Sequence, residues 1–330
     1  KKKYIKYKSK YLKLSNINGG AKSSKQNTQI ILFNAGHFGD IFFVTEIVRN
    51  LVKCNPDLKI SLWNRENCYY LYSNIDNIEL LTLEKKMAET EKKDFTKYII
   101  SDNKLFINIY YPCSSFLSWS NIYQCYNPYL IQNVFIKIIN EINSDKKLNI
   151  NFKYEKLAKN QLIPKLKLSK IPETIEKQLI TPKKLIFYYN VTPRTYSNFY
   201  AISHKKAITK LCNIFKKHLI IVPKTINLEL ENLICLEKNG IVKNSDGENG
   251  VQYAQIARKC EHVILYDSGI CFPSLVDNNN KLYIVEPILK FGYIYLNSQI
   301  SFFDLIKQEN INKKLPKRII LGKEIIKISI

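Results

Sequence analysis

Two series of alternating strand-like and helix-like segments constrain the fold of this chain more than any other feature. In the first series, the apolar run QIILFN at residues 29–34 precedes a helical pattern, and the strand-like LKISLW follows at residues 58–63. In the second series, KLIFYYN at 184–190, a helical pattern at 203–217 and HLIIVP at 218–223 follow one another in the same way. Such alternation is typical of parallel sheets with helices on both faces. We therefore expect an α/β fold with two Rossmann-like, doubly wound parallel-sheet domains that face each other across a cleft.

The stretch between the two series, residues 151–183, is rich in Lys, contains three prolines and lacks the alternation, so we expect it to be an interdomain connection. It divides the chain into an N-terminal domain at 28–150 and a C-terminal domain with a tail at 184–330. A chain of 330 residues with 45% apolar residues is long enough for two cores. The patterns also predict strands at 104–111, 261–267 and 281–287, a helix at 127–145 capped by Asn127, a helix at 203–217 capped by Ser203, and a helix at 251–260.

Residues 1–27 form a segment of their own, with nine lysines and no acid. We expect a basic flexible tail. The apolar residues Tyr4, Tyr7, Tyr11 and Leu14 fall at helical spacing, and this leaves open a short amphipathic helix that contacts an anionic surface. This opening also resembles those of many proteins from giant DNA viruses.

The formal net charge of +23 raises the question of nucleic-acid binding. Arg is the usual reader of base edges, yet only five of the 51 basic residues are Arg. We therefore expect no specific nucleic-acid partner, although a basic nucleic-acid-binding protein stays an alternative. The eight cysteines form no CxxC pair and the four histidines show no metal-ligand spacing, so we expect reduced thiols and no metal site. With no secretory signal or membrane-spanning run, the expected location is the cytoplasm, which for a viral protein means host cytoplasm or virion.

The segment NAGHFGD follows the first strand and carries candidate site residues. Gly36 and Gly39 allow the backbone to turn tightly and approach a ligand, with His37 between them. Asp40 falls in the first turn of the following helix. The GxGxxG fingerprint of dinucleotide-binding proteins is absent, which disfavours a nicotinamide cofactor. On this evidence alone, a cap of the helix and partner of its dipole is the favoured interpretation of Asp40.

Two further polar segments follow strands of the second series. Thr192 and Arg194 come after the strand at 184–190, where a hydroxyl and a guanidinium suit phosphate oxygens, although an ordinary polar loop would look the same. The strand at 261–267 ends at Asp267, and Ser268 and Gly269 are expected to open a helix, whose free N–H groups could hold an anion. A simple capped turn is the alternative.

Together these segments, in this order and spacing, resemble the heptosyltransferase family, glycosyltransferase family 9, which has the GT-B fold. The resemblance implies an inverting glycosyltransferase that moves a sugar from a nucleotide-diphosphate donor to a hydroxyl of a glycan, lipid-linked or protein acceptor. Asp40 matches the family's "GD" motif and would be the general base. Asp267, Ser268 and Gly269 match the "D-[ST]-G" motif that holds the donor diphosphate, and Thr192 and Arg194 match the loop beside it. The resemblance implies metal-independent chemistry and no cofactor.

Three positions depart from the family pattern. Phe272 stands where a His is expected, Ser197 where a Lys is expected, and Glu286 where a Gly is expected. These departures bear on the identity of the donor and on activity. A catalytically inactive GT-B-like protein that binds sugars or partners is therefore an alternative to an active transferase.

Overall fold

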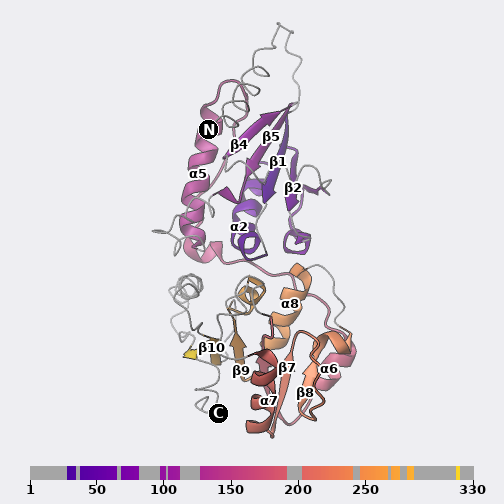
Figure 1. Cartoon of the computed structure of the whole chain (residues 1–330). Helices are drawn as coiled ribbons and strands as arrows, with labels where there is room; N and C mark the ends of the chain where they lie inside the picture. The colour runs from indigo at the N-terminus through magenta and orange to yellow at the C-terminus, as the bar shows by residue number, and fades with distance from the viewer. Residues whose placement is uncertain are drawn as a thin grey trace, which may run out of the picture.

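The structure of the protein is a computed structural model. It describes residues 28–34, 38–64, 68–81, 97–101, 103–111, 127–191, 203–240, 246–266, 269–275, 281–285 and 317–319. Two sheets, both dominated by parallel strands, lie in successive halves of the chain (Figure 1). The expected α/β fold class is confirmed.

The first sheet is built around β1 (Gln29–Asn34), and its strand order is β3-β2-β1-β5-β4. The other strands are β2 (Ile60–Asn64), β3 (Ile78–Leu80), β4 (Tyr98–Ser101) and β5 (Lys104–Asn108). All pairs are parallel except β4 with β5, which form an antiparallel hairpin. The helices α2 (Phe38–Cys54) and α5 (Pro128–Ser144) belong to this half and contact each other.

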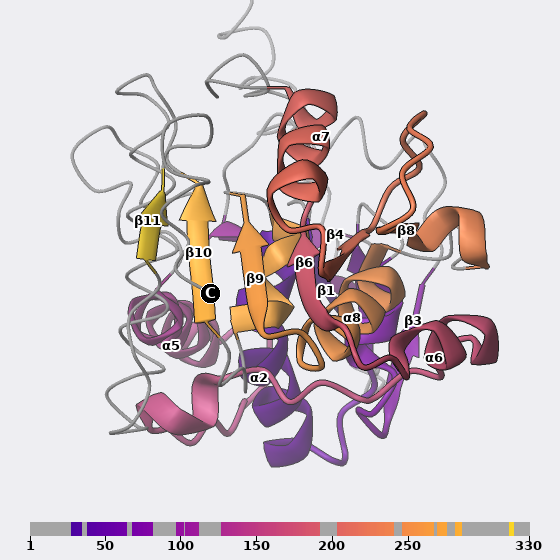
Figure 2. The same cartoon turned by 90° about the horizontal axis from the view of Figure 1, so that it is seen from below.

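The second sheet has the strand order β11-β10-β9-β6-β7-β8, and all its described pairs are parallel. Figure 2 shows β11, β10, β9 and β6 side by side. Its strands are β6 (Lys184–Tyr188), β7 (His218–Val222), β8 (Leu233–Cys235), β9 (His262–Leu265), β10 (Lys281–Val285) and β11 (Lys317–Ile319). The accompanying helices are α6 (Glu173–Leu179), α7 (His204–Ile214) and α8 (Asp246–Ala257). When β6 is numbered as strand 1 of this half and the sheet is read from β8 to β11, the order is 3-2-1-4-5-6. This is the Rossmann arrangement.

Helix starts follow the local signals in the sequence. The Asn127 side chain accepts hydrogen bonds from the backbone N–H groups of Tyr129 and Leu130, and Pro128 occupies the first turn of α5. The Ser203 hydroxyl accepts from the N–H of Lys206 at the start of α7. Both expected caps are confirmed.

The connection between the sheets is held by side-chain amides. Asn143, Asn55, Gln132 and Gln255 each accept a hydrogen bond from the N–H of one connection residue and donate one to its carbonyl oxygen. Their partners are Phe152, Lys153, Leu157 and Ser169 respectively. We call these four side chains the amide clamps. Because they satisfy both backbone groups as a neighbouring strand would, an extended segment outside any sheet keeps its hydrogen bonds.

The stretch expected to be the connection contains a short helix, α6, whose Thr174 hydroxyl donates to the carbonyl oxygen of Asn239. Two local expectations were wrong. The strand expected at 104–111 ends at Asn108, because the Asn108 side chain accepts from the N–H groups of Tyr110 and Tyr111 and turns the chain. The α-helix expected from Ser268 is instead a 3₁₀ segment, η6 (Gly269–Leu275), with Pro273 inside it. Proline removes a backbone donor and obstructs a continuing α-helix.

Buried apolar side chains form two clusters. The smaller lies between the second sheet and α7, and the larger runs without a break through both halves of the chain. The six described cysteines are free thiols, five of them buried. Within the described residues, no helix has the length and apolar character needed to cross a membrane.

Candidate functional site

Each of the two main candidate motifs follows a strand next to the point where the strand order of its sheet reverses. In the first sheet the strand order reverses between β1 and β5, and α2 begins soon after β1 ends. In the second sheet it reverses between β6 and β9, and η6 begins soon after β9 ends. Ligands of open α/β sheets bind outside the carboxyl ends of the strands at such points. Both motifs therefore occupy the part of the fold where a ligand site is expected.

Gly39 and Gly269, one from each motif, are in direct contact. A Cβ atom added to Gly269 would lie 2.6 Å from the backbone nitrogen of Gly39 and 3.0 Å from its Cα. Real Cβ atoms do not approach backbone this closely, so residue 269 has no room for a side chain. The structure thus brings the start of α2 and the start of η6 together from opposite halves of the chain.

Asp40 follows Gly39 in the first turn of α2, and only 9% of it is exposed. The unpaired N–H groups at a helix start favour a negative charge there. Its backbone position, one residue from the contact with Gly269, places Asp40 at the junction of the two halves.

A buried group of hydroxyls and an imidazole closes the carboxyl end of the second sheet. The Tyr188 hydroxyl lies 2.9 Å from Nδ1 of His204 and 2.5 Å from the Tyr266 hydroxyl. Burial raises the pKa of both tyrosines and lowers the pKa of His204 to about 4, so the group is uncharged at neutral pH. Tyr266 directly precedes Asp267, and these bonds therefore hold the strand end from which the second motif leaves.

Two further hydrogen-bonded pairs fix neighbouring loops. The hydroxyl of Tyr189, just after β6, lies 2.5 Å from the Ser274 hydroxyl on η6. The Asn190 side chain accepts from the N–H of Lys224 and donates to its carbonyl oxygen, which joins the ends of β6 and β7. The residues that follow these two strands are thus tied to each other and to η6.

The first sheet ends in a row of buried asparagines. Asn34, Asn64 and Asn108 are the last residues of β1, β2 and β5, three neighbouring strands, and each is at most 6% exposed. Asn34 and Asn64 stand opposite each other in the register. Our sequence interpretation missed this row and the Tyr188–Tyr266–His204 group. The signal for the row was present, since an asparagine stands within or at the end of each of three strand-like segments.

Most of the candidate residues lie outside the described part of the chain. These are Gly36, His37, Thr192, Arg194, Asp267 and Ser268. Of the candidates, the structure describes Gly39, Asp40 and Gly269, and it brings all three to one place. The roles given to the candidates stay predictions. Among the residues that the structure does describe, no group of three or more His, Cys, Asp or Glu could hold a metal ion.

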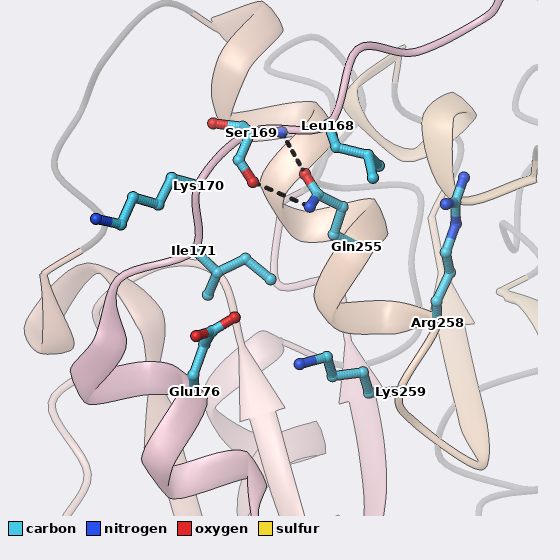
Figure 3. Close-up of a pocket in the computed structure, with 8 residues that line it drawn as sticks. All are labelled: Leu168, Ser169, Lys170, Ile171, Glu176, Gln255, Arg258 and Lys259. Carbon is cyan, nitrogen blue, oxygen red and sulfur yellow. Dashed lines mark hydrogen bonds between the residues drawn. The ribbon is translucent and has the colours of Figure 1, made fainter.

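A pocket of about 470 Å³ lies elsewhere, between the connection, α6 and α8 (Figure 3). Its lining combines apolar and charged side chains: Leu168, Ser169, Lys170, Ile171, Glu176, Gln255, Arg258 and Lys259. The Gln255 clamp on Ser169 forms part of its wall. None of the candidate residues from the sequence lines this pocket.

Comparison with known proteins found similarity among solved structures. No family model matches the chain, and no curated protein matches it. A glycosyl transferase family 9 structure from Veillonella parvula is 12% identical with a TM-score of 0.42, over 80% of this chain and 83% of that one. E. coli ADP-heptose LPS heptosyltransferase II is 12% identical with a TM-score of 0.42, over 85% and 99%. E. coli heptosyltransferase WaaC with ADP is 10% identical with a TM-score of 0.40, over 78% and 86%.

Proposed function

We propose that this protein is a glycosyltransferase that moves a sugar from a nucleotide-diphosphate donor to a hydroxyl acceptor with inversion. One observation supports it most directly: Gly39 of the "GD" motif and Gly269 of the "D-[ST]-G" motif meet across the two halves of the chain. A transferase of this kind needs its base and its diphosphate-binding loop on opposite sides of one reacting centre. In the sequence the two motifs are far apart, and their meeting in the fold supplies the closeness that a shared reacting centre requires.

In the proposed reaction, the acceptor hydroxyl oxygen attacks the anomeric carbon and forms the new glycosidic bond. The bond between that carbon and the diphosphate oxygen breaks, and the nucleoside diphosphate leaves with the electron pair. Asp40 accepts the hydroxyl proton as the bond forms. Ser268, Gly269, Thr192 and Arg194 stabilise the charge that develops on the diphosphate.

The contact between the glycines limits where the donor lies. The space on the Gly39 side of Gly269 cannot hold even a methyl group, so it cannot hold a phosphate. We therefore place the diphosphate beside the contact, on the side of the second sheet's strand ends. The row of asparagines at the carboxyl edge of the first sheet lies on the acceptor side of this arrangement.

We further propose that the mechanism needs no metal ion and that the acceptor is a glycan, a lipid-linked molecule or a protein. We also propose that the protein comes from a giant DNA virus. The basic tail at 1–27 would add contact with an anionic surface, which is testable on vesicles with and without anionic lipid. Removal of the tail should abolish that binding and leave turnover intact.

The test is a donor screen with the purified full chain. We expect one class of nucleotide-diphosphate sugar to raise the melting temperature and, with an acceptor, to release nucleoside diphosphate. The anomeric configuration of the product, measured by NMR, should be opposite to that of the donor. If no such donor binds, the proposal is wrong. If a donor binds but neither transfer nor hydrolysis occurs with any acceptor, the protein is the inactive GT-B-like binder that Phe272 and Ser197 suggest.

A further inference from the structure

Phe38, the first residue of α2, belongs to the first half of the chain, but its ring packs on the second half. The ring atom Cζ lies 3.1 Å, and Cε1 3.5 Å, from the point that a Cβ at Gly250 of α8 would occupy. Cγ1 of Ile270 on η6 lies 3.5 Å from the same point. Only 5% of Phe38 is exposed. The ring therefore occupies a socket formed by the bare backbone of α8 and the side chain of Ile270.

This joint is part of the main core rather than a surface contact. The larger apolar cluster contains Phe38 together with Ile41 and Phe42 of α2, and also Tyr253 of α8 and Cys271 of η6. Apolar burial of this kind favours a fixed relation between two parts of a chain, because separation exposes the surface to water.

The ring is held from its own helix as well. Phe42, one turn further along α2, stacks on Phe38 with ring centroids 6.2 Å apart and an interplanar angle of 26°. Residues two apart on a helix point to roughly opposite sides, so the ring of Phe38 does not compete with the side chain of Asp40 for space. An anchor at Phe38 can thus fix the first turn of α2 without displacing the side chain of Asp40.

We infer that Phe38 is a positioning residue: its fit into the Gly250–Ile270 socket sets the place of Asp40 relative to Gly269. The inference rests on the proposed function, because it gives Phe38 its effect through the base. This role also explains why residue 250 is a glycine, because the ring of Phe38 lies against the position that a side chain there would occupy. Placement of a base within a few tenths of an ångström matters, and an error of 1 Å can cost on the order of 10²-fold in rate.

The test is a compensating pair of substitutions across the joint. Gly250→Ala adds a methyl group where the ring lies, and Phe38→Leu shortens the side chain that the methyl group would meet. We expect each single variant to lower kcat by about tenfold to a hundredfold with little change in donor KM. The double variant should recover much of the lost kcat, because the methyl group then fills the space that the ring leaves.

Two controls separate positioning from general damage. Alanine is a better helix former than glycine, so a loss of turnover in Gly250→Ala cannot come from a weaker α8. Phe135→Leu makes the same substitution in the core of the first half, where the ring packs edge-to-face on Tyr154. It should lower the melting temperature without the selective loss of kcat.

Thermal unfolding of the wild type, the two single variants and the double variant gives a readout that does not depend on activity. Non-additive melting temperatures for the Phe38 and Gly250 variants are expected from residues in contact. If the pair is coupled in unfolding but kcat is unchanged in every variant, the joint is structural only and the inference is overturned. If the wild-type protein turns over no donor, the proposed function fails and the positioning role falls with it, whereas the coupling in unfolding remains.

Discussion

The side chain of Gln255 on α8 hydrogen bonds to both backbone groups of Ser169: its Oε1 accepts from the N–H at 2.8 Å, and its Nε2 donates to the carbonyl oxygen at 3.0 Å. It is the amide clamp that holds the connection to the second half (Figure 3). A neighbouring side chain, Gln252, adds a hydrogen bond to the carbonyl oxygen of Lys170 at 3.1 Å. On the other side, the carboxylate of Glu46 on α2 accepts from the N–H of Lys165 at 2.7 Å. The connection is therefore fixed to both halves by side chains.

The first prediction concerns this clamp. Gln255→Leu keeps a similar volume but leaves the N–H and carbonyl groups of Ser169 without their partners. We expect a loss of about 1–2 kcal/mol in the free energy of unfolding, measured in urea. The same substitution at Gln178 removes one exposed hydrogen bond to Asn239 and should cost less than about 0.5 kcal/mol. Equal losses in the free energy of unfolding at the two positions would show that the clamp on Ser169 stabilises the protein no more than an exposed hydrogen bond does.

The second prediction concerns pH. Burial lowers the pKa of His204 and of His262 to about 4, and for His262 it outweighs the carboxylate of Glu261 nearby. The unfolded chain takes up these protons near pH 6.5, and the folded chain does not until about pH 4. Stability should therefore fall as the pH drops from 6.5 towards 4, by about 2–3 kcal/mol for each histidine.

Urea unfolding at pH 7, 6, 5.5 and 5 checks this, because most carboxylates still keep their charge in that range. His204→Gln should remove part of the slope. Stability that is flat from pH 7 to pH 5, or a slope that the substitution leaves unchanged, would show that the buried imidazole does not titrate as expected.

The third prediction concerns the contact between Gly39 and Gly269. In Gly269→Ala the methyl group would meet backbone, which no rotamer change can relieve. We expect a loss of about 1–3 kcal/mol in the free energy of unfolding and a lower rate of sugar transfer. In Gly250→Ala the methyl group meets a side-chain ring at 3.1 Å rather than backbone at 2.6 Å, so this variant should cost less stability. A Gly269→Asp variant would add a charge to the same clash, so alanine is the cleaner probe of the contact.

Local signals in the sequence predicted many of the elements. β1 and β7 were expected at the positions where they occur, because short apolar runs with clear boundaries define them. Asn127 and Ser203 were expected to cap their helices, since a cap depends only on the next few residues. The helix α8 begins earlier than the expected Val251, at Asp246, in a polar stretch that lacks an apolar repeat.

Features that depend on distant partners could not be predicted in the same way. The clamp between Asn55 and Lys153 joins residues far apart in the chain, and an asparagine in a sequence does not reveal its partner. The same holds for the site. The sequence placed Asp40 and Gly269 at the carboxyl ends of two strands, but their proximity depends on how the two halves pack. The socket for Phe38 exists only because α8 presents a glycine at that point.

The fourth prediction concerns Asp40, for which a general base and a partner of the helix dipole are the two interpretations. Asp40→Asn keeps the shape of the side chain and removes its basicity. A base should account for about 10²–10⁴-fold in kcat, with donor affinity nearly intact. A dipole partner should instead cost about 0.3–1 kcal/mol of stability and leave turnover near normal.

Asp57→Asn is the matched control, because Asp57 is an exposed acid in the turn after α2 and lies outside the proposed site. It should change neither turnover nor stability by much. The comparison needs a confirmed donor and acceptor, with turnover and unfolding measured on both variants. Normal turnover in Asp40→Asn would remove the base from the mechanism, since the structure places no other described candidate acid beside Gly269. The inactive binding protein would then be the better explanation for the contact between the two glycines.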